Sequence, residues 1–200
     1  MSTAYQFWTD FADGAVMFPL GIALAIALAI LGRYRAALTW ATTIGCVWAV
    51  MLVLKFTGYT IDATFPDSPF NDIDLVTPSG HVASSAAIYG GLAALLLSRS
   101  GNRSRRAILV AIGVAASIGA TRILLGDHSL SEVLVGAAVG IAGAARLASR
   151  AKPATEPRAR LALAAAALTV VIVFHGDHLT VEDSIHHSAL RASRALRMRH

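Results

Sequence analysis

Charged side chains are scarce in this chain. Asp, Glu, Lys and Arg account for 14% of its 200 residues, against roughly 25% in soluble domains, which excludes an ordinary water-soluble protein. Hydrophobic residues account for 56%, and the mean hydropathy is +0.61. They form long uninterrupted blocks instead of recurring at helical spacing, a pattern typical of membrane spans. The sequence therefore predicts an integral membrane protein.

Cysteine is almost absent too. Cys46 is the single one, so no internal disulfide can form, and its apolar block predicts a plain role in the core. Lys and Arg are missing from the first 16 residues, which carry Asp10 and Asp13 instead; we therefore do not expect a cleavable signal peptide. The sequence also contains no internal repeat and no second soluble region, and we expect one membrane domain over residues 1–200.

The apolar sequence falls into six blocks and predicts an all-α fold, a polytopic membrane helix bundle with about six transmembrane helices. The blocks are Ala15–Gly32, Ala36–Phe56, Pro78–Leu97, Ala107–Arg122, Glu132–Leu147 and Leu161–Phe174. A polar loop, Thr57–Val76, follows the second block, and a basic turn, Ser98–Arg106, follows the third. In the fifth block, Gly136 and Gly140 have the small-xxx-small spacing that lets helices approach closely. For the mixed apolar and basic tail, Val181–His200, two interpretations stay open: a helix on the membrane surface or a disordered segment.

The net charge of +5 does not indicate a nucleic-acid partner, because the basic residues form short clusters between apolar blocks. If all six blocks span, 11 of the 17 Lys and Arg residues fall on one side, and the positive-inside rule places that side in the cytosol. The other side receives Lys55, Arg122 and four tail arginines, and the basic tail is the one conflict. We expect a bacterial inner membrane protein whose candidate site faces the periplasm or exterior.

The stretch Thr77-Pro78-Ser79-Gly80-His81 has the features of a helix start. Thr77 is a candidate cap, and Pro78 suits the first helical position. The free N–H groups of a helix start and the positive end of its dipole favour an anion such as phosphate. Gly80 lets a ligand approach the backbone, and His81 stands beside it as a proton donor or acceptor near neutral pH.

A second group of chemically active residues ends the fourth block and begins the fifth. Glu132 lies one helical turn after His128 and can orient its imidazole, and an oriented imidazole is a nucleophile. Arg122 offers a planar fork of donors to phosphoryl oxygens, and Lys55 adds a second cation on the same predicted face. His81 would then protonate the leaving group.

Each of these residues also has a structural interpretation. Ser129-x-x-Glu132 is a capping box. Lys55 and Arg122 sit at span ends, where basic side chains commonly extend toward water. Either histidine can be a satisfied interfacial residue. Their occurrence together on one predicted face favours a catalytic site over these separate explanations.

Pro78-Ser79-Gly80-His81 followed by Arg122-x5-His128-x3-Glu132 resembles the type 2 phosphatidic acid phosphatase superfamily, from about Lys55 to Gly143. That family's pattern is Lys-x6-Arg-Pro, Pro-Ser-Gly-His and Ser-Arg-x5-His-x3-Asp. This chain has Thr121 for the serine and Glu132 for the aspartate, whereas Asp62 and Ala63 replace the first Arg-Pro.

The resemblance implies a membrane enzyme that dephosphorylates a lipid phosphate or lipid pyrophosphate without a metal or other cofactor. If the roles of the family's motif residues apply to the matching positions of this chain, His128 is the nucleophile, Glu132 is its orienting carboxylate, and His81 is the general acid and later the general base. The phosphate-binding residues would be Lys55, Ser79, Gly80 and Arg122. We also expect Asp62 to be turned away from the phosphate by its loop, because a carboxylate would repel the dianion.

Two other functions stay open. A phosphotransferase would use the same phosphohistidine with an acceptor other than water, and residue spacing does not separate transfer from hydrolysis. A lipid-binding or transport protein with a decayed site is the third possibility. The intact His81, His128 and Glu132 argue against it, since a decayed site loses its chemistry first. Lipid phosphate and membrane lipids are the partners expected; the sequence does not indicate whether the protein has a protein partner.

Overall fold

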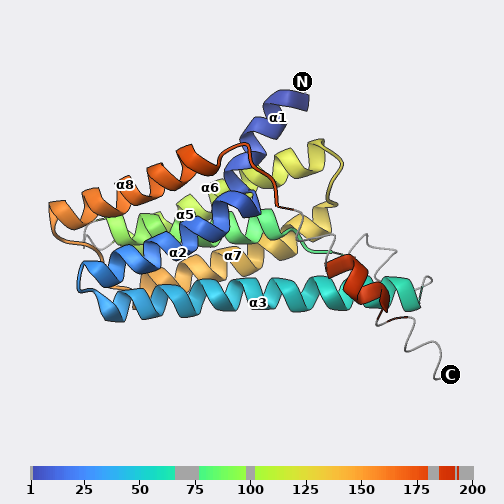
Figure 1. The fold of residues 1–200 in the computed structure, drawn as a ribbon, viewed down its shortest axis with the longest axis horizontal. Helices are drawn as coiled ribbons and strands as arrows, with labels where there is room; N and C mark the ends of the chain where they lie inside the picture. The colour runs from blue at the N-terminus through green and yellow to red at the C-terminus, as the bar shows by residue number, and fades with distance from the viewer. Residues whose placement is uncertain (1, 66–76, 98–101, 180–184, 192, 194–200) are drawn as a thin grey trace.

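A computed structural model describes residues 2–65, 77–97, 102–179, 185–191 and 193 of the chain. Within these ranges the regular elements are all helical, which confirms the predicted all-α class. They are α1 (Ser2–Thr9), the 3-10 helix η1 (Asp10–Ala12), α2 (Gly14–Ile30), α3 (Tyr34–Thr64), α5 (Gly80–Leu96), α6 (Arg103–Leu124), α7 (Leu130–Arg150) and α8 (Pro157–Phe174) (Figure 1). Residues 185–191 and 193, in the tail, are also helical.

Helix α5 lies at the centre of the bundle. It packs most extensively against α7 and α6, and also contacts α3 and α2 (Figure 1). Small residues make the approach to α7 close: a Cβ on Gly136 would lie 2.4 Å from the carbonyl oxygen of Ser79, and one on Gly140 would lie 2.5 Å from that of Ala83. The predicted small-xxx-small contact is thus confirmed, and it fixes the start of α5 against α7.

Five helical stretches are long and apolar enough to cross a membrane, by length and composition. They are Thr3–Ile30, Tyr34–Thr64, Arg103–Leu124, Leu130–Arg150 and Pro157–Phe174. The sixth predicted span corresponds to α5, which has 17 residues and is about 26 Å long, shorter than a hydrocarbon core of about 30 Å. Large apolar side chains such as Ile22, Leu38 and Leu168 are exposed on the sides of the bundle, where lipid would cover them.

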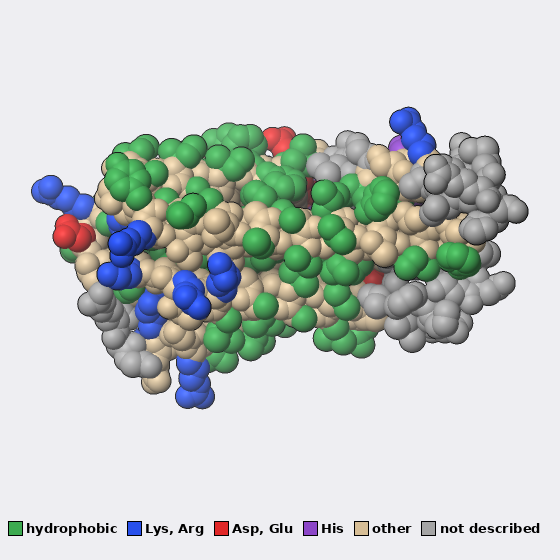
Figure 2. Space-filling model, turned by 90° about the horizontal axis from the view of Figure 1, so that it is seen from below, with side chains coloured by type: hydrophobic (Ala, Val, Ile, Leu, Met, Phe, Trp, Pro, Cys, Tyr) green, Lys and Arg blue, Asp and Glu red, His purple; other side chains and the backbone are tan. Residues whose placement is uncertain are grey.

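Most of the basic side chains visible in Figure 2 gather at one end of the bundle, where α2 meets α3 and α7 meets α8. Several of them hold this end together. Arg33 donates to the carbonyl oxygens of Lys152 and Pro153, and Arg103 donates to the carbonyl oxygen of Ala151. Helix α5 starts at the opposite end, so the two ends of the bundle differ in charge as well as in structure.

Several predicted boundaries and one burial prediction are wrong. Helix α3 ends at Thr64 and not at Phe56, so Asp62 lies on a helix instead of in a loop. The polar residues continue the helix because their hydroxyls bond back to it, as Thr60 does to the carbonyl of Phe56 at 2.7 Å. Helix α6 starts at Arg103, inside the predicted basic turn. Cys46 is exposed on α3 and is no part of the core.

Candidate active site

The candidate site lies where α5 begins, at the end of the bundle opposite the basic cluster. Ser79 is the N-cap of α5 and Gly80 its first residue, so the predicted cap at Thr77 is wrong. Thr77 instead donates its N–H to Glu132 Oε1, and its Oγ1 lies 3.2 Å from the same oxygen. The N–H of Ser79 donates to the carbonyl of Glu132 at 3.1 Å. Hydrogen bonds between Thr77 and Glu132 therefore connect the stretch Thr77–His81 to the stretch that ends with Glu132.

His128 and Glu132 form a buried pair. His128 Nδ1 and Glu132 Oε2 are 2.9 Å apart, which leaves Nε2 of the histidine for a reacting atom. The capping box is also present: Ser129 Oγ accepts from the N–H of Glu132 at 3.2 Å, and Glu132 Oε2 accepts from the N–H of Ser129 at 3.3 Å. The predicted capping box is therefore confirmed, and it is compatible with an orienting role for Glu132, because one carboxylate makes both contacts.

Two cations approach the start of α5 from different helices. Lys55, in α3, is 6% exposed, and its Cε would lie 3.6 Å from a Cβ on Gly80, so its side chain crosses the helix start instead of extending toward water. Arg122, in the last turn of α6, lies 3.1 Å from Asp127 through Nη1. Both cations are close enough for their charges to act on His81.

Two buried donors at this site have no hydrogen-bond partner within the described part of the chain: Ser79 Oγ and Arg122 Nε. A buried polar group without a partner costs about 1–3 kcal/mol. An anion at the start of α5 would satisfy both groups together with the first N–H groups of the helix. The donor set therefore fits a phosphoryl group.

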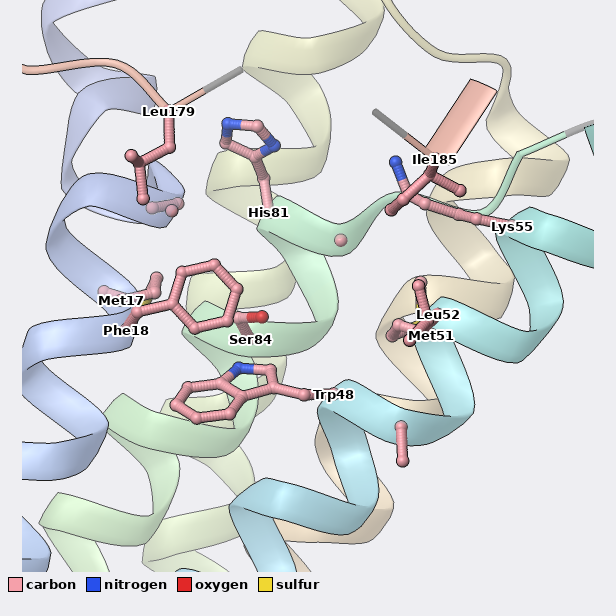
Figure 3. A pocket seen from close by; sticks show the side chains of 14 residues that line it. Met17, Phe18, Trp48, Met51, Leu52, Lys55, His81, Ser84, Leu179 and Ile185 are labelled. Carbon is pink, nitrogen blue, oxygen red and sulfur yellow. The ribbon is translucent and has the colours of Figure 1, made fainter. Parts of the chain in front are cut away.

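An apolar cavity of about 310 Å³ leads away from this anion site. It lies between α2, α3 and α5, and its lining includes Phe18, Trp48 and Met51 beside Lys55 and His81 (Figure 3). Leu52 also lines the cavity and is 52% exposed on the outer side of α3. The wall of the cavity therefore reaches the outer face of α3, which lipid would cover.

One acidic contact of the site was missed in the sequence. Asp13 Oδ2 lies 3.5 Å from His81 Nε2, and Asp13 is 8% exposed. The two residues are far apart in the chain, and Asp13 belongs to neither motif. Its position just before an apolar block indicates a helix cap at most, and it does cap α2, since its Oδ1 accepts from the N–H of Ala15 at 2.8 Å.

The replaced position of the first motif lies near the site but not in it. Asp62 comes seven residues after Lys55, which places it on the same face of α3 and about 10 Å farther along the helix. It is partly buried and does not line the cavity. The expectation that a loop turns Asp62 away is therefore wrong, because the helix itself sets its distance from Lys55.

The fold and the site together define a helical membrane protein with two histidines, each facing a carboxylate, beside two cations at the start of a central helix. The PAP2 superfamily model matches residues 53–156, just over half of the chain, and the chain belongs to this superfamily. The match covers every residue predicted for the site and confirms the resemblance; the superfamily generally comprises phosphatases.

A curated relative from Klebsiella pneumoniae is described as "Uncharacterized 22.5 kDa protein in cps region". It is 29% identical over 157 residues, which cover 76% of this chain and 72% of the relative. No solved structure matches the chain. Asp13 lies outside the family match, so the family pattern gives no signal for it.

Proposed function

We propose that the protein is a membrane-embedded phosphatase that hydrolyses a lipid phosphate or lipid pyrophosphate through a phosphohistidine on His128. The observation that carries the proposal is the shared wall of the cavity, where His81 and Lys55 stand beside Phe18, Trp48 and Met51. A phosphate bound at the start of α5 would place the chain of its lipid in this apolar space. A water-soluble phosphate ester would have no use for it.

In the first step, Nε2 of His128 attacks phosphorus and the bond from phosphorus to the leaving oxygen breaks. His81 gives a proton to that oxygen, so the alcohol or phosphate leaves as a stable species. Glu132 accepts a hydrogen bond from Nδ1–H of His128 and balances the charge that the ring gains. Lys55, Arg122 and Ser79 face the phosphoryl oxygens, and Gly80 leaves the backbone N–H groups open to them.

In the second step, His81, now neutral, takes a proton from water as the water oxygen attacks phosphorus. The bond from phosphorus to Nε2 of His128 breaks, inorganic phosphate leaves, and both histidines return to their starting states. In both steps the protons pass between water, His81 and the leaving oxygen, and the charges are balanced by Glu132, Lys55 and Arg122.

The orientation follows the charge difference between the ends. With the basic end in the cytosol, the start of α5 faces the opposite side of the membrane. We therefore place the site at the outer face of a bacterial inner membrane, where the tail helix that contacts Tyr59 through His186 would also lie.

The test offers the purified protein in detergent a set of lipid monophosphates and diphosphates, with EDTA present, and measures released phosphate. Quenching in alkaline SDS then traps the phosphoenzyme, because phosphohistidine is stable in base and labile in acid. The wild type should release phosphate and form this adduct, and His128→Ala should do neither. His187→Ala, which alters an exposed histidine, is the control and should match the wild type. Phosphate found on an added alcohol instead of in solution would make the protein a transferase, and no turnover of any lipid would refute the proposal.

A further inference from the structure

Asp13 holds the end of the His81 ring that faces away from the cations. Asp13 Oδ2 and His81 Nε2 are 3.5 Å apart, and both side chains are largely buried, at 11% and 20% exposed. Asp13 Oδ1 is held in turn by the N–H of Ala15 at 2.8 Å and that of Leu179 at 3.2 Å. Nδ1 of the half-exposed His178 also lies 3.5 Å from Asp13 Oδ2, so neighbouring groups hold both oxygens of the carboxylate that meets His81.

The remaining nitrogen of His81 faces the anion site. Figure 3 shows the ring with one nitrogen on the side of Leu179 and the other on the side of Lys55. Because Asp13 binds both the Leu179 N–H and His81 Nε2, the nitrogen on the Lys55 side is Nδ1. A proton delivered to a leaving group at the start of α5 would therefore come from Nδ1.

We infer that Asp13 is the positioning residue of the general acid, an inference that rests on the proposed phosphatase function. It accepts a hydrogen bond from His81 Nε2–H, fixes the ring, and leaves Nδ1 as the atom that gives and takes the proton. The site then contains two carboxylate–imidazole pairs with opposite ring use. Glu132 binds Nδ1 of His128 and frees Nε2 for attack, whereas Asp13 binds Nε2 of His81 and frees Nδ1 for proton transfer.

The test replaces Asp13 by serine. Serine is among the best N-caps, so the start of α2 keeps its cap, but the short side chain no longer reaches the imidazole. The matched control is Asp10→Ser. Asp10 is a buried carboxylate of the same segment. It accepts from Gln6 at 3.2 Å and, like Asp13, lies near Nδ1 of His178, at 3.9 Å, but no contact between it and His81 occurs among the described residues. Both variants are compared with the wild type by gel filtration in detergent.

Two substrates separate the role of an acid from that of structure. Dodecyl phosphate has an alcohol that leaves only after protonation, whereas 4-nitrophenyl phosphate has a phenolate that leaves without it. Asp13→Ser should lower kcat for dodecyl phosphate at least tenfold, as part of the roughly 10²–10⁴-fold that the general acid itself contributes, and change kcat for the aryl ester much less. Asp10→Ser should change neither. An equal loss on both substrates, or an equal loss in the control, would overturn the inference.

A second measurement does not depend on activity. The ring N–H of His81 should give a downfield, slowly exchanging proton NMR signal, assigned by its absence in His81→Gln. The signal should be present in the wild type and in Asp10→Ser and missing in Asp13→Ser; its absence from the wild type would overturn the pairing. If the wild type cleaves neither phosphate, the phosphatase proposal and the acid role of His81 both fall, and the ring signal then decides the Asp13 contact by itself.

Discussion

The close approach of α7 to the start of α5 gives a test, because Gly136 belongs to neither motif but lies against the N-cap residue of α5. In Gly136→Ala, the new Cβ would lie 2.4 Å from the carbonyl oxygen of Ser79, whereas ordinary contact begins at 3.4 Å. The start of α5 must therefore move by about 1 Å away from α7. A misplacement of 1 Å can cost about 10²-fold in rate.

The effect on folding should be smaller than the effect on turnover. Overpacking costs about 1–3 kcal/mol, and alanine recovers nearly 1 kcal/mol over glycine in a helix interior. We therefore expect Gly136→Ala to fold, to lose up to about 2 kcal/mol of stability, and to lose roughly 100-fold in kcat. Phosphate release from one lipid phosphate measures the rate, and thermal unfolding in detergent measures the stability.

Two other glycines serve as controls. Gly113→Ala meets no atom within 4 Å and should keep its rate. Gly90→Ala would place a Cβ 2.7 Å from that of Ala111 and 2.8 Å from that of Ala144, so it overpacks the middle of α5 and should lose stability while retaining its rate. If Gly136→Ala turns over like the wild type, or if Gly90→Ala loses as much rate, the position of Ser79 does not control the chemistry.

Three further outcomes are expected. Lys55→Ala and Arg122→Ala should each lower phosphate release by about 10²-fold or more, whereas Asp62→Ala and Lys152→Ala should keep most of it; an inactive, folded Asp62→Ala would require a direct role for that carboxylate. Leu52→Trp should raise KM for dodecyl phosphate but not for 4-nitrophenyl phosphate, because it narrows the mouth of the cavity; the neighbouring Val53→Trp, at a position 62% exposed and outside the cavity lining, should raise neither. On a Cys46→Ser background, an impermeant thiol reagent should label Phe65→Cys in intact cells and spare Asn102→Cys, and the reverse pattern would invert the orientation.

Much of the fold could be predicted because membrane spans leave a strong local signal. Five of the six apolar blocks correspond to helices long enough to cross a membrane. The remaining block corresponds to α5, which is also apolar but shorter than the other five. Hydropathy failed at the end of α3, since it reports where lipid ends and not where the helix ends. Residues 57–64 are polar but remain helical, because a helix satisfies its own backbone in water as well as in lipid.

The site was predictable as far as its residues lie in short patterns. His128 and Glu132 are one helical turn apart, so spacing alone predicts their contact, which the structure places at 2.9 Å. Thr77 could not be assigned in this way, because its partner Glu132 is remote in sequence and a local cap was the simpler expectation. The contact between Asp13 and His81 could not be predicted from the sequence at all. It depends on the packing of α2 beside α5, and no residue spacing indicates that packing.

The position of the cavity wall at the lipid-facing side of α3 has a consequence for kinetics. Under the proposed function, a lipid that reaches the cavity from this face would approach by diffusion within the plane of the bilayer, so its encounter rate would depend on its mole fraction among the surrounding lipids or detergent molecules. Diluting the substrate with inert detergent at constant bulk concentration should therefore slow turnover. The two products would also leave the site into different phases, because phosphate dissolves in water and the dephosphorylated lipid stays in the membrane.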